Sequence, residues 1–314
     1  MIIDFHSHYF PKEYIKELDN GGPYLRRVPK PILKELWDIE TRFKDPERKG
    51  IDVEVISLSN PMLDFVTRKK APELAKIVNN DIAEVVRKYD GKFVGIAALP
   101  FTNMPFVLEE LDRAVKDLDL RGVSVCTHVA GRSINEPEFW PFWKRVNELD
   151  VPVLLHPESP FGMEWGKMNE YTLTLFVGFP FETTLTVAKL MLSGIFEQYP
   201  NLKVFAPHGG GALPYLIGRL DTGYKAYSYV REDAPNPPSS YLKNVYIDGI
   251  TFYKQPFALA YQTLGANNMV FGTDYPYRIG TTADLVGIIK NAEMPENEKE
   301  KIFNQNAKRL LRVK

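Results

Sequence analysis

Short apolar runs rich in β-branched residues alternate along the chain with longer amphipathic segments. Eight such runs predict β-strands, at 2–5, 53–58, 93–99, 122–126, 153–155, 204–206, 245–247 and 269–271. The amphipathic segments predict helices, at 71–89, 107–118, 138–149, 183–199, 213–226 and 297–311. Near-continuous apolar strands separated by helices are typical of a parallel sheet that is covered on both faces.

Eight strand-and-helix units predict a closed (β/α)8 or TIM barrel, distorted and enlarged by loop insertions. Such a barrel needs roughly 250 residues, so we expect a single domain over 1–314. An open doubly wound sheet is the alternative architecture. The barrel is favoured because polar residues follow strands one, five, six and eight. In a closed barrel those strand ends surround one mouth, whereas an open sheet would spread them apart.

Glycine and proline clusters interrupt the alternation at 20–39 and 231–240. Clusters of this kind predict loops. Loops of this length at the mouth of a barrel are often lids or subunit contacts.

The charge balance adds little to this picture, with 39 basic and 40 acidic residues and a formal net charge of −1. Such a chain has no general attraction for nucleic acid or an anionic membrane, so a small-molecule substrate is expected. Cys126 is the only cysteine, which rules out an intrachain disulfide. No signal sequence precedes the first strand and no apolar run approaches membrane-spanning length, so we expect a cytoplasmic protein without a transmembrane helix.

Four of the five histidines and one aspartate fall where predicted strands end. His6 and His8 close the first strand, His156 closes the fifth, His208 follows the sixth and Asp274 follows the eighth. Imidazole and carboxylate groups are the ligands of borderline metals, and barrel enzymes build active sites at the carboxyl ends of their strands. The pattern therefore predicts a metalloenzyme.

The spacing of the first pair has a geometric reason. Residues two apart on a strand point to the same side, so His6 and His8 can both face the barrel axis while Phe5 and Ser7 face the helices. A His-x-His taken alone is a weak signal, because histidine is also a common, partly buried polar residue.

The motifs around these residues resemble the amidohydrolase superfamily. They are IDFHSH at 3–8, LHP at 155–157, APHGGGALP at 206–214 and GTDYP at 272–276. Within the superfamily the chain is most similar to the branch of aminocarboxymuconate semialdehyde decarboxylase, through further matches at 79–81, 93–95, 127–129, 177–184 and 218–219.

The resemblance implies that His6, His8, His156 and Asp274 bind one divalent metal, usually zinc, with a water completing the shell. Manganese or iron would also suit such ligands. His208 would hydrogen-bond this water and act as general base, since a metal lowers the pKa of bound water toward ~7. Superfamily members with two metals have a carboxylated lysine on strand four, and 123–128 contains no lysine. One metal is therefore expected.

Two further residues are candidates for substrate binding. The resemblance implies that Arg219 reaches a neighbouring subunit and grips a substrate carboxylate with its planar donors, which requires at least a dimer. The alternative is a surface salt bridge. Glu158 could serve as a second acid or base near the mouth, or be a solvated loop charge.

Other positions keep simpler alternatives beside their functional interpretation. Asp274 could merely cap a turn, and His128 at the end of strand four is expected to have a hydrogen-bonding structural role. The glycines at 209–211 could form a turn, or let backbone amides approach an anionic substrate group.

The chain departs from the decarboxylase pattern at two places. Arg26, Arg27 and Lys30 lie in the loop after strand one without a clear match to the arginine that binds a carboxylate there. Glu158 stands where that branch has a tryptophan, which makes the pocket more polar and more negative.

Together these features predict a metal-dependent carboxy-lyase that acts on a small unsaturated or aromatic carboxylic acid, with a metal-bound water and His208 as general acid and base. A metal-dependent hydrolase of a lactone, amide or related carbonyl compound is the alternative. A third hypothesis is a barrel without catalytic activity that keeps its metal for stability or binds a small acid.

Overall fold

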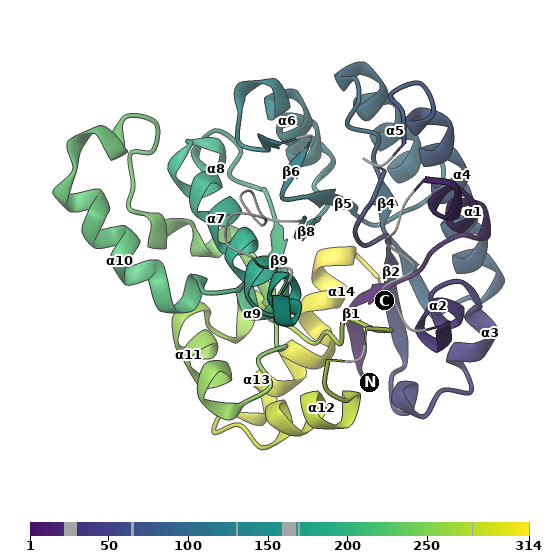
Figure 1. The fold of residues 1–314 in the computed structure, drawn as a ribbon. Helices are drawn as coiled ribbons and strands as arrows, with labels where there is room; N and C mark the ends of the chain where they lie inside the picture. The colour runs from purple at the N-terminus through teal and green to yellow at the C-terminus, as the bar shows by residue number, and fades with distance from the viewer. Residues whose placement is uncertain are drawn as a thin grey trace.

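The computed structural model describes residues 1–21, 30–63, 66–129, 131–158, 168, 170–277 and 279–313. Parallel strands form a barrel surrounded by helices (Figure 1). The strands are β1 (Ile3–His8), β2 (Val53–Ser57), β3 (Phe93–Gly95) with its continuation β4 (Ala97–Ala98), β5 (Val123–Cys126), β8 (Val153–His156), β9 (Val204–Ala206), β10 (Val245–Asp248) and β11 (Met269–Val270). They pair in the orders β1-β2-β3 and β11-β10-β9-β8-β5-β4.

Backbone hydrogen bonds join the two sheets at both seams. At Ile96 the chain changes partner, because its N–H donates to Ile56 O at 3.0 Å and the next N–H, of Ala97, donates to Gly122 O at 2.9 Å. At the other seam the Phe5 N–H donates to Phe271 O at 2.8 Å. The predicted TIM barrel is confirmed, and its distortion lies at these two seams.

The principal helices are α1 (Lys12–Gly21), α2 (Lys30–Trp37), α3 (Ile39–Arg42), α4 (Ala71–Lys88), α5 (Met104–Lys116), α6 (Trp140–Leu149), α7 (Phe179–Leu192), α8 (Ile195–Gln198), α10 (Leu213–Ala226), α11 (Lys254–Leu264), α12 (Thr282–Lys290), α13 (Glu296–Glu300) and α14 (Asn306–Leu311). Two π-helical segments, η5 (Thr174–Gly178) and η9 (Lys301–Gln305), run into α7 and α14. A short antiparallel pair, β6 (His128–Val129) and β7 (Arg132–Ser133), follows β5.

Several predicted boundaries are wrong for identifiable reasons. The helix expected at 183–199 breaks into α7 and α8 at Gly194, whose φ of 77° leaves the helical region. The region 20–39, expected to be a loop, contains the end of α1, the whole of α2 and the first residue of α3. Pro31 occupies an early position of α2, where the missing N–H costs nothing, so this proline starts a helix instead of preventing one.

The helical stretch Glu170–Leu192 is long and apolar enough to cross a membrane by length and composition, contrary to expectation. Glu182 and Lys189 interrupt its sequence, so no unbroken apolar run is visible there. Half of its most apolar window is buried inside the protein. The core helix of a protein that never enters a membrane meets the same criterion.

Apolar side chains fill the barrel interior in alternation with others that face the helices. The interior cluster comprises Ile3, Phe5, Val53, Val55, Val94, Ile96, Leu154, Phe205 and Val270, with Ala307, Leu310 and Leu311 from α14. Phe5 was expected to face the helices, and this prediction is wrong. An irregularity in the pairing of β1 between Asp4 and Ser7 lets both Phe5 and His6 lie against Phe205, with ring centroids 5.1 and 5.6 Å away.

A buried ionic network ties β1, β2 and the segment after β11 together. The Arg48 guanidinium donates to Glu54 Oε1 at 3.0 Å, to Asp4 Oδ2 at 2.8 Å and to Thr273 Oγ1 at 3.1 Å. Arg42 donates to Glu54 Oε2 at 2.8 Å and to the carbonyl of His8. Burial alone would raise the pKa of Glu54, but Arg48 and Arg42 outweigh it and the pKa is lowered. The carboxylate of Glu54 is therefore held in its charged form.

We expect Arg48→Ala to lower the free energy of unfolding by about 3–5 kcal/mol, because it leaves buried carboxylates without their partner. Urea unfolding followed by circular dichroism measures the loss. Arg121→Ala is the matched control, since Arg121 pairs with Asp119 at the surface and such pairs contribute at most about 1 kcal/mol. Equal losses in both variants would contradict the role given to the network.

Candidate metal centre and active site

Imidazole and carboxylate groups from distant parts of the chain meet at the carboxyl ends of the strands. His6 and His8 belong to the last half of β1, and His156 is the last residue of β8. His208 lies in the tight turn α9 (Pro207–Gly210) directly after β9, and Asp274 follows β11. The structure thus brings together all five residues that the sequence pattern singled out.

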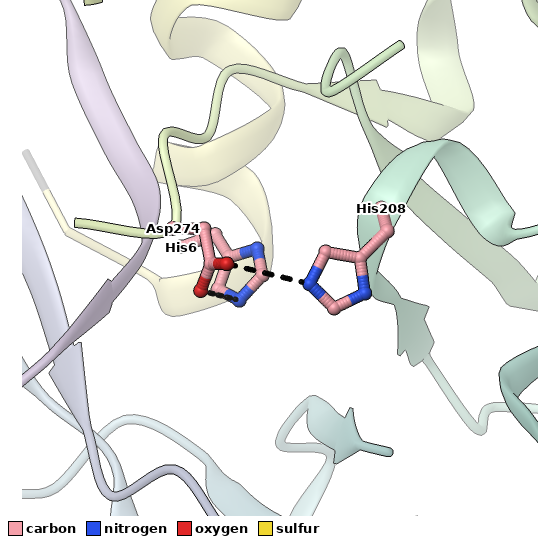
Figure 2. A group of neighbouring side chains, drawn as sticks. All are labelled: His6, His208 and Asp274. Carbon is pink, nitrogen blue, oxygen red and sulfur yellow. Dashed lines mark ion pairs between the residues drawn. The ribbon is translucent and has the colours of Figure 1, made fainter. Parts of the chain in front are cut away.

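The ligand atoms of this cluster are in close contact. His8 Nε2 lies 3.2 Å from His6 Nε2 and 3.0 Å from Asp274 Oδ1, and His6 Nε2 lies 3.4 Å from the same oxygen. Figure 2 shows His208 approaching Asp274 from the opposite side, with its Nε2 3.6 Å from Asp274 Oδ2. The ring of His156 packs against His8, with centroids 5.2 Å apart.

These separations fit a divalent metal. Two ligand atoms at 2.0–2.1 Å from a tetrahedral ion are about 3.4 Å apart, close to the three distances among His6, His8 and Asp274. His6, His208 and Asp274 also each offer one ligand atom within 4.8 Å of the others. Geometry therefore allows His208 either to stand beside the metal as a base or to bind it.

Each of the three strand histidines has its Nδ1 occupied by a protein partner. His6 Nδ1 lies 2.8 Å from Asp248 Oδ2, and His8 Nδ1 lies 3.3 Å from Ser57 Oγ. His156 Nδ1 lies 3.2 Å from the amide nitrogen of Asn60 and 3.0 Å from its neighbouring carbonyl. The Asp248 carboxylate fixes the tautomer of His6, because Nδ1 must carry the proton that it accepts. All three contacts orient the rings with Nδ1 toward the protein, which leaves each Nε2 for a metal.

Asp248 is the residue that the motif search missed. It ends β10, is fully buried, and accepts hydrogen bonds from His6 and from the backbone N–H groups of His208, Gly209 and Ile250. Burial raises its pKa, but His6 and the other donors more than offset this, and the pKa is lowered. A polar residue that closes the apolar run 245–247 was the available signal.

For His8, His156 and Asp274 the electrostatics favour the protonation states that metal ligands need. Burial lowers the pKa of His8 to about 4 and that of His156 well below its usual range, so both rings are neutral at neutral pH. Burial alone would raise the pKa of Asp274, but the surrounding histidines hold it well below its usual range. For His6, the carboxylates of Asp274 and Asp248 outweigh burial and raise the pKa.

Backbone strain is concentrated at two of these residues. His208 and Asp274 have φ angles of 57° and 59°, in the left-handed region that side chains other than glycine rarely adopt. A Cβ on Gly211 would lie 2.1 Å from Pro180 O, so this turn requires glycine. The amides of His208 and Gly209 bind Asp248. They are therefore used to shape the turn and not to hold a substrate anion.

Comparison with known proteins agrees with this geometry. Residues 3–313 match the family described as amidohydrolase. The chain belongs to the amidohydrolase family. It is 28% identical to the 2-amino-3-carboxymuconate-6-semialdehyde decarboxylase of Dictyostelium discoideum, covering 98% of this chain and 91% of that protein. It is 29% identical to the gamma-resorcylate decarboxylase of Polaromonas sp., covering 99% and 98%.

A solved structure supports both the fold and the metal. The dihydroxybenzoic acid decarboxylase of Polaromonas sp., with bound manganese and the inhibitor 2-nitroresorcinol, superimposes with a TM-score of 0.86. It is 27% identical and covers 99% of this chain and 96% of its own. Together with the cluster of ligand atoms, this supports one divalent metal in the present amidohydrolase.

The cluster opens into an apolar pocket. His208 and Asp274 line a cavity of about 240 Å³ whose other described walls are Leu175, Phe176, Pro180, Ile250, Phe252 and Ile279. The polar groups of the site thus lie against a largely hydrophobic space.

The two predicted substrate-binding residues, Glu158 and Arg219, differ in their relation to this centre. Asn60 links Glu158 to the cluster, because its side chain donates to Glu158 Oε1 at 2.6 Å while its backbone contacts His156. Arg219 is exposed on α10, which projects from the barrel (Figure 1), and makes no ion pair with any described residue. The alternative interpretation of Arg219, a surface salt bridge, is therefore not seen among the described residues.

The structure describes less of His128 and of the three basic residues expected in the loop after β1. His128 begins β6, where it pairs with Ser133, and is half-buried. Arg26 and Arg27 lie outside the described residues, as does the side chain of Lys30.

We expect Asp248→Asn to weaken binding of Mn²⁺ or Zn²⁺ to the metal-free protein about 10- to 100-fold, because the neutral amide no longer fixes the His6 ring. Titration of the metal into chelator-treated protein, followed by calorimetry, measures this. Asp90→Asn removes an exposed carboxylate and should bind metal like the parent protein. Unchanged affinity in the Asp248 variant would exclude the orienting role.

Proposed function

We propose that this amidohydrolase is a metal-dependent carboxy-lyase that removes CO2 from a small aromatic or unsaturated carboxylic acid. The observation that carries the proposal is the buried His/Asp cluster, with His208 on one side of it, opening into an apolar pocket. The activities of the related decarboxylases support it.

His6, His8, His156 and Asp274 would hold the metal. We propose Zn²⁺ on the basis of a donor set of three imidazoles and a carboxylate, with Mn²⁺, as in the related structure, or Fe²⁺ as alternatives. A bound divalent ion supplies positive charge that polarises an oxygen of the substrate or of water. The protein's contribution is to present the neutral rings of His8 and His156 and the ionised carboxylate of Asp274 in a buried site.

We assign proton transfer to His208. Its ring lines the same cavity as Asp274 and is partly exposed, unlike the buried His8. When the bond between the carboxyl group and its carbon breaks, CO2 leaves and the electron pair stays on that carbon. The imidazole of His208 first accepts a proton from the carboxyl group or from water and then donates it to that carbon, so that hydrogen takes the place of the lost CO2.

The pocket favours a planar hydrocarbon skeleton over a strongly polar substrate. Its described walls carry Leu175, Phe176, Ile250, Phe252 and Ile279, so burying an aromatic ring there is favourable. Glu158 adds negative charge on the side of His156, where it would interact with hydroxyl groups of the substrate.

The hydrolase alternative is not favoured, because the three related proteins named above are decarboxylases. A purely structural metal site is also a poor fit. Such a site is closed by its ligands, whereas this cluster borders a cavity of about 240 Å³ and has an additional histidine beside it.

The position of Arg219 supports a dimer in which the arginine serves the partner's site. It lies exposed on a projecting helix, free of ion pairs with the described residues. Exposed apolar side chains surround this region, since α10 presents Tyr215 and the adjacent α7 presents Phe181 and Leu185. A second copy that covers these side chains would bring Arg219 to a substrate carboxylate.

We expect the metal-loaded enzyme to release CO2 from at least one acid in a panel of hydroxybenzoates and muconate semialdehydes, measured by CO2 capture and chromatography of the product. His208→Ala should keep one metal per chain by elemental analysis and lose at least about 100-fold in turnover, as expected for a general acid and base.

Metal content and turnover of the His208→Ala variant distinguish a metal ligand from a proton carrier. Loss of metal from the His208 variant would make His208 a ligand. Retained turnover would remove it from proton transfer, and a panel without CO2 release would contradict the carboxy-lyase.

We expect Arg219→Ala to fold normally and to raise KM, because the carboxylate loses its bidentate partner. The decisive measurement mixes inactive His208→Ala with Arg219→Ala protein under conditions that exchange subunits. If the arginine acts across subunits, each mixed dimer contains one site with both residues intact, and activity returns. Absence of recovery, with mixed dimers verified by mass spectrometry, would place Arg219 in its own subunit's site or outside catalysis.

A further inference from the structure

The loop between β10 and α11 holds a phenylalanine in an unfavourable backbone conformation. Phe252 has a φ of 61°, and the N–H of Tyr253 donates to Thr251 O at 2.8 Å across it. This bond closes a three-residue γ-turn with Phe252 at its centre. The form of γ-turn with positive φ is rare and strained, and a bulky residue in it is unusual.

The strained turn places the Phe252 ring at the pocket of the active site. Phe252 lines the same cavity as His208 and Asp274, and it is 42% exposed despite being one of the largest apolar side chains. Ring atoms of Phe252 lie 3.0 and 3.1 Å from where a Cβ on Gly280 would stand. One side of the ring therefore packs against the backbone of Gly280, which has no side chain, and the remaining ring surface is exposed.

The same loop is packed against the turn that carries His208. A Cβ on Gly209 would lie 2.8 Å from Thr251 Cγ2 and 3.4 Å from Ile250 O. The backbone that carries Phe252 and the turn that carries His208 are thus packed side by side. Strain of this kind persists only where the surroundings enforce it, and it is concentrated at sites of function.

We infer that Phe252 is a specificity-determining residue whose ring forms an aromatic wall against which a planar substrate ring packs. The inference rests on the proposed function, because it assigns the class of substrate that the site accepts. Leu175 and Phe176 belong to the remaining wall of the cavity. A flat aromatic acid can contact the Phe252 ring over its face or edge, whereas a saturated ring offers no such contact.

Binding measurements test this separately from turnover. The ligands are 2,6-dihydroxybenzoate and cyclohexanecarboxylate, one planar and one saturated ring. Each is titrated calorimetrically into metal-loaded protein that carries His208→Ala, so that turnover does not contribute to the heat, and the protein with this change alone serves as the parent. Phe252→Leu keeps an apolar side chain and removes the aromatic face. It should weaken binding of the aromatic acid by about 2- to 10-fold, the equivalent of an aromatic pair, and leave the saturated acid unchanged.

Two further variants serve as references. Phe252→Ala should weaken the aromatic acid by about tenfold or more with unchanged metal content, since it removes the apolar contact as well. Phe43→Ala is the matched control, because Phe43 is 49% exposed but packs on Tyr89 and Phe93, away from the cavity. It should bind both acids like the parent protein.

The binding results for the aromatic and the saturated acid decide whether Phe252 forms an aromatic wall. Equal affinity of the leucine variant and the parent for both acids, or equal loss for both, overturns the aromatic wall. Tight binding of the aromatic acid that is lost in the Phe252 variants, together with no CO2 release by the enzyme with His208 intact, supports the wall and counts against the carboxy-lyase. A parent protein that binds neither acid overturns the aromatic wall, while CO2 release from the panel of acids decides the carboxy-lyase separately.

Discussion

Closure of the barrel between β1 and the segment after β11 is the constraint on which the site depends. Backbone hydrogen bonds from Phe5 to Phe271 and from His8 to Tyr275, each 2.8 Å, set the two segments side by side. They bring Asp274 within 3.0 Å of His8, although 266 residues separate them in sequence. Arg48 strengthens the seam from outside by binding Asp4 and Thr273. The same contacts that close the fold therefore assemble the metal ligands.

Residues that hydrogen-bond the ligands determine the orientation of the ligand side chains, and burial and neighbouring charges determine their protonation. Asp248 orients His6 and, through the amides of His208 and Gly209, also shapes the turn that carries His208. One buried carboxylate thus serves both the metal ligand and the proposed proton carrier. Burial keeps His8 neutral while the histidines keep Asp274 ionised. The centre is arranged for a cation before any cation binds.

Three of the nine described residues other than glycine that have a positive φ line the pocket. His208, Phe252 and Asp274 all line the pocket, and all three have φ between 57° and 61°. Each lies just after a strand or in the loop that follows one, where the regular sheet no longer fixes the backbone. The barrel behind them supplies the packing that makes such conformations tolerable. The packed barrel therefore holds these three side chains at one cavity despite their unfavourable backbone conformations.

The sequence by itself determined the fold class and the five residues of the cluster, because strand periodicity and the polar residues at strand ends are local signals. The alternation of strands and helices needs only neighbouring residues, and His6, His8, His156, His208 and Asp274 all follow that pattern. It did not determine which way Phe5 points, because the irregularity in β1 depends on pairing with β2. The contacts that give Asp248 its role, the Arg48 network and the γ-turn at Phe252 were likewise not predictable from the sequence. Their meaning lies in contacts between residues far apart in the chain, which only the closed barrel brings together.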